Sequence, residues 1–143
     1  MRYVVDTNVF NRIVDGRFSR AELPQDAELV ATHIQIDEIN RTGDPDRRAV
    51  LFLAFAQHQP AIVPTESAVW DVSRWGQAKW GQSQHHANLR AKLDSRNGGK
   101  ANNLQDVLIA EVAIANGYGL VTADEDLAAA TREFTNKVIH VAT

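Results

Sequence analysis

Four acidic residues stand where short apolar runs give way to helix-like patterns, and their side chains could share one chemistry. They are Asp6, Glu38, Asp106 and Asp124. In a parallel α/β sheet, functional groups gather at the carboxyl ends of the strands, so residues far apart in the sequence can converge there. Crowded carboxylates raise one another's pKa and need positive charge among them. Mg²⁺ and Mn²⁺ suit this role, because these hard cations prefer oxygen ligands and often bind a few carboxylates together with substrate phosphate.

Each of these residues also has an ordinary structural use. Asp6 and Asp124 directly follow apolar runs and could serve only as helix N-caps. Asp106 suits the first turn of a helix, where the helix dipole favours a carboxylate, and Glu38 taken alone suits an exposed helix position. A shared site is the better account of all four, because Asp106 interrupts an almost wholly apolar helix at the end facing the strands. Glu111, in the same helix, is expected to be solvated or paired with a basic residue.

The elements that would position these carboxylates alternate between strand and helix. Strands are predicted at short apolar, β-branched runs, which are 3–5, 29–32, 61–63, 119–122 and 138–141. Helices are predicted after Asp6, through 36–39, over 48–56 as a largely buried helix, from Ser67 with an open end, over 103–116 and over 124–134. The alternation implies a parallel sheet covered by helices on both faces.

Length and composition indicate one soluble domain spanning residues 1–143. The first residues lack the apolar core of a signal peptide, and no apolar run approaches the ~20 residues of a membrane span. We therefore expect a cytoplasmic protein with no membrane partner. The absence of cysteine excludes thiol chemistry.

The charge is unevenly placed along the chain. Net charge is −3, yet 70–100 holds six Lys/Arg against two Asp. One cationic segment on an acidic body is compatible with a phosphate track beside a carboxylate site, and equally with a solvated helix face. Within that segment Trp75, Trp80 or His86 could stack on unpaired bases, whereas core packing is favoured for Trp70.

The acidic blocks together resemble the PIN-domain nucleases, and the size of the chain resembles the VapC-type toxins of toxin–antitoxin systems. The blocks are VVDTNV at 4–9, IDEI at 36–39, LQDVLIAEVAIANG at 104–117 and LVTADEDL at 120–127. Their order and spacing agree with that family over nearly the whole chain. One departure is Leu127, which stands where many relatives carry Phe.

The resemblance implies a PIN-like three-layer α/β sandwich with a central parallel sheet flanked by helices. It implies hydrolysis of RNA phosphodiester bonds by a water activated on Mg²⁺ or Mn²⁺, which attacks phosphorus in line with the leaving 3′ oxygen. The implied catalytic residues are Asp6, Glu38, Asp106 and Asp124, of which Asp6, Asp106 and Asp124 would hold the metal, supported by Asn8 and Thr122. Asp126 could replace Asp124 as the nearer ligand, and Asp37 admits a shift of register from Glu38.

The resemblance also implies partners: an RNA substrate, a small antitoxin protein and a second copy of the chain. Apolar residues beyond what one core face requires, such as Leu51, Phe52 and Phe55, favour the homodimer as well. A symmetric contact is the default for a small homo-oligomer.

Two other functions compete with the nuclease. A phosphatase with Asp6 as phosphorylated nucleophile usually needs a second Asp two positions on, where this chain has Asn8, and no lysine follows in a comparable late motif. A non-catalytic PIN-like module that only binds RNA or protein is the other, and the intact acidic positions speak against it. The chain has no Gly-x-Ser-x-Gly elbow and no phosphate-cradling glycine loop.

Overall fold

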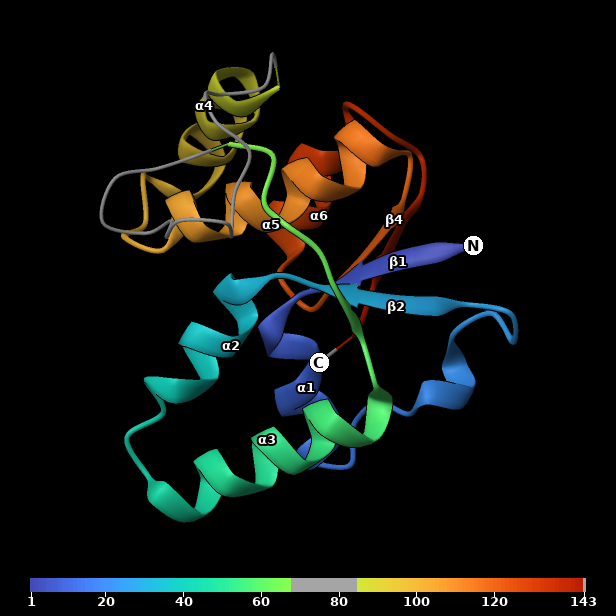
Figure 1. Ribbon diagram of the computed structural model, residues 1–143. Helices are drawn as coiled ribbons and strands as arrows, with labels where there is room; N and C mark the ends of the chain where they lie inside the picture. The colour runs from blue at the N-terminus through green and yellow to red at the C-terminus, as the bar shows by residue number, and fades with distance from the viewer. Residues whose placement is uncertain (68–84, 143) are drawn as a thin grey trace.

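The computed structural model describes residues 1–67 and 85–142 and shows an α/β fold on a five-stranded, all-parallel sheet (Figure 1). The strands are β1 (Arg2–Val5), β2 (Glu28–Ala31), β3 (Ala61–Ile62), β4 (Gly119–Thr122) and β5 (Val138–His140). Their order is β3-β2-β1-β4-β5, so the first strand of the chain lies at the centre. All carboxyl ends therefore meet at one edge of the sheet.

The helices cover both faces of this sheet. They are α1 (Thr7–Val14), α2 (His33–Asn40), α3 (Pro45–His58), α4 (His86–Asn97), α5 (Asn103–Asn116) and α6 (Glu125–Arg132), with a short 3₁₀ helix η1 (Arg20–Glu22). Figure 1 shows α1, α2 and α3 together on one side of the strands and α4, α5 and α6 on the other. The three-layer α/β architecture expected from the sequence is confirmed.

Two cores result from the alternation of side chains along the strands. Val4 and Leu120 point into the core under α4, α5 and α6. Their neighbours Val5 and Val121 point into the opposite core, against α1 and α3. Strands buried on both faces are apolar at successive positions, which is why the apolar runs at β1 and β4 predicted strands correctly.

Helix α5, which the sequence indicates to be almost wholly apolar, is the central helix of the fold. Its middle residues, from Asp106 to Ala113, are all buried. Gly117 ends it in the left-handed conformation with φ 69°, which glycine adopts without steric cost.

Helix α3 differs from the prediction of a largely buried helix. Only Leu51 and Ala54 are buried along it, whereas Val50 and Leu53 are 47% and 58% exposed. The apolar run at 48–56 does not give a buried helix, because its residues point to several sides of α3.

The helix predicted from Ser67 through Trp70 and Trp75 falls almost entirely outside the described residues.

Of the two alternatives expected for Glu111, a solvated side chain is wrong, whereas a basic partner is present in His86. It is fully buried in α5, where its Oε2 accepts a 2.8 Å hydrogen bond from Ser67 Oγ. Its Oε1 lies 3.6 Å from Nδ1 of His86, itself buried. Glu111 therefore links residue 67 and the start of α4 to the central helix.

None of the helices within 1–67 and 85–142 combines the length and the apolar character needed to cross a membrane.

Close packing between β1 and β4 yields a stability prediction. Gly119 is the register partner of Tyr3, and a Cβ at 119 would overlap the Tyr3 ring and lie 3.2 Å from the carbonyl oxygen of Lys137. Gly119→Ala should lower the free energy of unfolding in urea by about 1–3 kcal/mol, the usual cost of overpacking. Gly43→Ala is the matched control, because a Cβ there meets open space. Equal stability of the two variants would contradict this packing.

Candidate metal and active site

Asp6 lies at the centre of the carboxyl edge, directly after β1. It is 3% exposed and caps α1, with Oδ1 accepting a 2.8 Å hydrogen bond from the Thr7 amide. Its Oδ2 accepts a 2.8 Å hydrogen bond from the hydroxyl of Thr122, at the end of β4. The N-cap use foreseen for Asp6 is therefore real, and the same carboxylate also lies inside the candidate site.

Glu38 reaches this edge from α2, whose start is fixed against β1. Gln35 closes a capping box with Thr32, and its Nε2 donates a 3.0 Å hydrogen bond to the carbonyl oxygen of Val5. Since Glu38 follows Gln35 by three residues, nearly one helical turn, it lies on the same side of α2. Its Oε1 is buried with no hydrogen-bond partner in the described part of the chain.

Asp106 enters from the first turn of α5 and is 4% exposed. Asn102, just before the helix, donates a 3.3 Å hydrogen bond to its Oδ2. The next residue, Asn103, is fully buried and donates to Asp94 and Asn97 of α4 at 2.7 and 2.8 Å. This amide network fixes the start of α5 against α4.

Asp124 caps α6 with a single oxygen. Its Oδ1 accepts hydrogen bonds from the amides of Asp126 and Leu127, at 2.9 and 3.1 Å. Its own amide donates to Thr122 Oγ1 at 3.0 Å, and Asn8 Oδ1 accepts a 3.0 Å bond from the amide of Ala123. Thr122 and Asn8 thus hold the loop that carries Asp124.

The carboxyl groups interact electrostatically. Burial raises the pKa of Asp6 to about 6 and that of Glu38 to about 7, with the charge of Asp124 adding to the first and that of Asp6 to the second. The pKa of Asp106 rises to about 8, first by burial and then through the charges of Asp6, Glu38 and Asp124. The charges of the four residues singled out in the sequence therefore influence one another at the carboxyl edge.

Asp126 lies differently from Asp124. Its Oδ1 is 3.5 Å from Nε of Arg96 on α4, so its carboxylate is engaged in a surface ion pair. The structure thus gives Asp126 a partner outside the carboxyl cluster, and this geometry favours Asp124 as the site residue.

The basic segment is largely neutralised where the structure describes it. Arg90 pairs with Asp94 at 3.2 Å, and Lys92 with Glu133 at 3.1 Å. Lys100 is the described residue of this segment whose charge acts on the site, since it lowers the pKa of Asp106.

His86 is buried against Glu111, so the expectation that its ring stacks on bases is wrong. Trp70, Trp75 and Trp80 lie outside the described residues.

The donor set suits a hard divalent cation, because all four side chains offer carboxylate oxygens and Glu38 has an unpartnered buried one. Among the residues that the structure describes, no group of three or more acidic or histidine side chains stands ready to hold an ion. The fit is therefore one of chemistry and location, and the side chains would have to turn toward a common point.

Sequence reasoning missed the residues that hold the carboxylates in place. These residues are Gln35, Asn102 and Asn103, whose side-chain amides donate the hydrogen bonds described above. The signal available was the Thr32-x-x-Gln35 spacing of a capping box at the start of α2.

Comparison with solved structures identifies the fold class. A chain of VapBC-5 from Mycobacterium tuberculosis, a member of the VapBC family of toxin–antitoxin systems, matches with TM-score 0.50 at 18% identity, covering 99% of this chain and 98% of that chain. A chain of VapBC2 from Rickettsia felis, bound to a promoter DNA fragment, matches with TM-score 0.50 at 14% identity, covering 98% of both chains. FitAcB from Neisseria gonorrhoeae gives TM-score 0.47 at 16% identity, covering 99% and 96%.

The protein therefore has the PIN-like α/β fold that its acidic blocks implied. It shares this fold, over nearly its whole length, with chains of the two VapBC complexes. No protein-family model and no curated protein matches the sequence.

The raised pKa values predict an unusual dependence of stability on pH. Above about pH 4, where unfolded carboxyl groups titrate, the folded state retains protons that the unfolded state has released, on Asp6 up to about pH 6, on Glu38 up to about pH 7 and on Asp106 up to about pH 8. Stability of the metal-free protein should therefore fall as pH rises from 5 to 8.

Urea unfolding in EDTA at several pH values measures this slope. Asp106→Asn should flatten it and be more stable than the wild type at pH 8, while Asp126→Asn should keep the wild-type slope. A wild-type stability that is constant or rises over this range would contradict the buried cluster.

Proposed function

We propose that this protein is a Mg²⁺- or Mn²⁺-dependent endoribonuclease and the toxin of a type II toxin–antitoxin pair, acting in the cytoplasm. The observation that supports the nuclease is that burial and neighbouring carboxylate charges raise the pKa of Asp6, Glu38 and Asp106, three acidic residues near the carboxyl edge. Burying several carboxyl groups together costs stability unless a cation compensates them, so their placement is best explained by a metal-dependent function.

The acidic residues would have different roles in the proposed hydrolysis. Asp6, Asp106 and Asp124 would hold the cation, which when bound lowers the pKa of water and neutralises charge on the phosphate. Glu38, whose pKa is about 7, is suited to take a proton from the attacking water at its unpartnered Oε1. Thr122 keeps Asp6 oriented through its hydroxyl.

The phosphatase alternative lacks a residue that its chemistry needs, because Asn8 stands where a second Asp two positions after Asp6 is usual.

The toxin assignment is supported by the fold neighbours, which come from toxin–antitoxin systems. A cluster of carboxylates attracts Arg or Lys, so an inhibitor that inserts a basic segment would compete with the metal. The antitoxin segment should therefore be basic, with an apolar anchor beside it.

Purified protein should cleave single-stranded RNA in the presence of Mg²⁺ or Mn²⁺ and lose this activity in EDTA. Asp106→Asn should lower the rate by at least about a hundredfold, as expected when a group that stabilises transition-state charge is lost. Asp126→Asn is the matched control, because Asp126 pairs with Arg96, and it should cleave at close to the wild-type rate. Metal-independent cleavage, or full activity of folded Asp106→Asn, would contradict the assignment.

Expression of the chain alone should arrest bacterial growth, and Asp6→Ala should abolish the arrest. Co-expression with the small open reading frame adjacent to its gene should restore growth. Harmless wild-type protein at high expression would contradict the toxin assignment while leaving the nuclease intact.

The homodimer also belongs to the proposal, but through different residues from those expected. Leu51 is buried, and Phe52 and Phe55 are partly buried against the core, whereas Val50 and Leu53 of α3 are exposed. Light scattering at micromolar concentration should give a dimer mass for the wild type and a monomer mass for Leu53→Lys. A monomeric wild type would contradict the dimer.

A further inference from the structure

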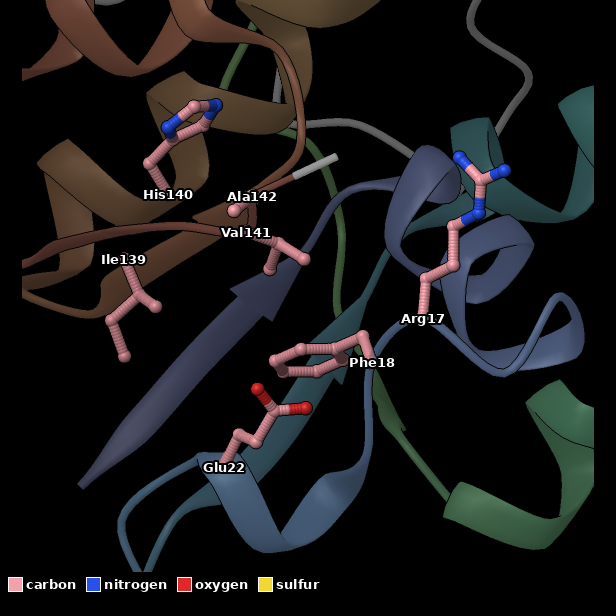
Figure 2. Close-up of a pocket in the computed structure, with 7 residues that line it drawn as sticks. All are labelled: Arg17, Phe18, Glu22, Ile139, His140, Val141 and Ala142. Carbon is pink, nitrogen blue, oxygen red and sulfur yellow. The ribbon is translucent and has the colours of Figure 1, made fainter.

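A pocket of about 310 Å³ lies on the α1 side of the sheet, where the end of β5 faces the segment after α1 (Figure 2). Its walls include an apolar part formed by Ile139, Val141 and Phe18. Arg17, His140 and Glu22 supply its polar groups. The volume is in the range of small-molecule sites, in which a few polar groups orient a ligand against apolar walls.

The polar groups are of three kinds and are separated from one another. Figure 2 shows Phe18 between the side chains of Arg17 and Glu22. Glu22 accepts the Ser19 amide with Oε2 at 2.7 Å, which orients its carboxylate at the start of η1. In the described chain, neither Glu22 nor Arg17 has an ion-pair partner, although both line the pocket. A ligand between them would therefore meet a cation at one end and an anion at the other.

One residue of the pocket, His140, contacts the loop that carries Asp124. The Nε2 atom of His140 lies 3.3 Å from the carbonyl oxygen of Ala123, the residue before Asp124. On the other side of the pocket, Arg17 lies beyond the C-terminal end of α1, the end opposite to Asp6.

A nucleotide offers the chemistry that these walls would recognise. Its phosphate suits a guanidinium, and the flat face of its base suits an apolar, aromatic wall. A carboxylate selects among bases, because it only accepts hydrogen bonds when ionised. Guanine presents two N–H donors side by side on its Watson–Crick edge and can therefore meet both oxygens of one carboxylate.

We propose that this pocket binds a guanine nucleotide of the RNA substrate, with the base against Phe18 and Val141, its Watson–Crick edge at Glu22 and its phosphate at Arg17. The inference rests on the proposed ribonuclease function for its RNA. It makes Glu22 a specificity-determining residue that favours guanine at a fixed spacing along the RNA from the cleaved bond.

Calorimetric titration of the full chain in EDTA with the four ribonucleoside monophosphates tests the pocket without cleavage. GMP should bind at least about tenfold more tightly than AMP, CMP or UMP, as expected for one extra charge-assisted hydrogen bond. Glu22→Gln, whose amide oxygen can still accept from Ser19, should remove this preference. Glu28→Gln is the control, because Glu28 is exposed on β2 and pairs with Arg2. Arg17→Ala should weaken GMP but leave guanosine unchanged.

Equal affinities for the four nucleotides, or a guanine preference that survives Glu22→Gln, would overturn the proposal.

A second experiment measures where the protein cuts RNAs in which a single guanosine is moved along the chain. The cut should move with the guanosine in the wild type and in Glu28→Gln, and lose this dependence in Glu22→Gln. Guanine binding without any metal-dependent cleavage would overturn the proposed function, and with it the substrate role, while leaving the pocket itself. Cleavage indifferent to guanosine would overturn the pocket and leave the nuclease.

Discussion

The hydrogen bond from Thr122 to Asp6 joins the carboxyl ends of two neighbouring central strands, and the other parts of the site are arranged around it. Both partners are buried, where a hydrogen bond is strengthened by the low local dielectric. Asp6 also accepts the Thr7 amide, and Thr122 also accepts the Asp124 amide. One pair of side chains thus fixes the start of α1 and the loop into α6 together.

The N-capping role of these carboxylates does not exclude the metal-binding role proposed for them. Asp124 caps α6 through Oδ1, and Asp6 caps α1 while its pKa is raised to about 6. N-capping places a carboxylate at the carboxyl edge because helices begin there in a parallel α/β fold. The fold therefore gathers acidic groups at one edge through ordinary capping, and α2 and α5 add Glu38 and Asp106 to them.

The sequence was sufficient to predict the strands, and to place Asp6 and Asp124 just after strands, because these signals are local. Runs such as that of β4, buried on both faces, and carboxylates after strands need no knowledge of the rest of the chain. The exposed faces of α3, the burial of Glu111 and the hydrogen bond from Gln35 to Val5 depend on which segments pack together. Long-range packing of this kind leaves no periodic signature, so it had to come from the structure.

The central claim is that the buried carboxyl cluster is a site whose protons are replaced by a divalent cation. Calorimetric titration of the protein with Mg²⁺ at pH 7, repeated in buffers of different ionisation enthalpy, measures the protons released on binding. The pKa values of about 6, 7 and 8 for Asp6, Glu38 and Asp106 predict net proton release at this pH. Asp106→Asn should reduce this release. Mg²⁺ binding without proton release, or no binding at millimolar Mg²⁺, would contradict the account.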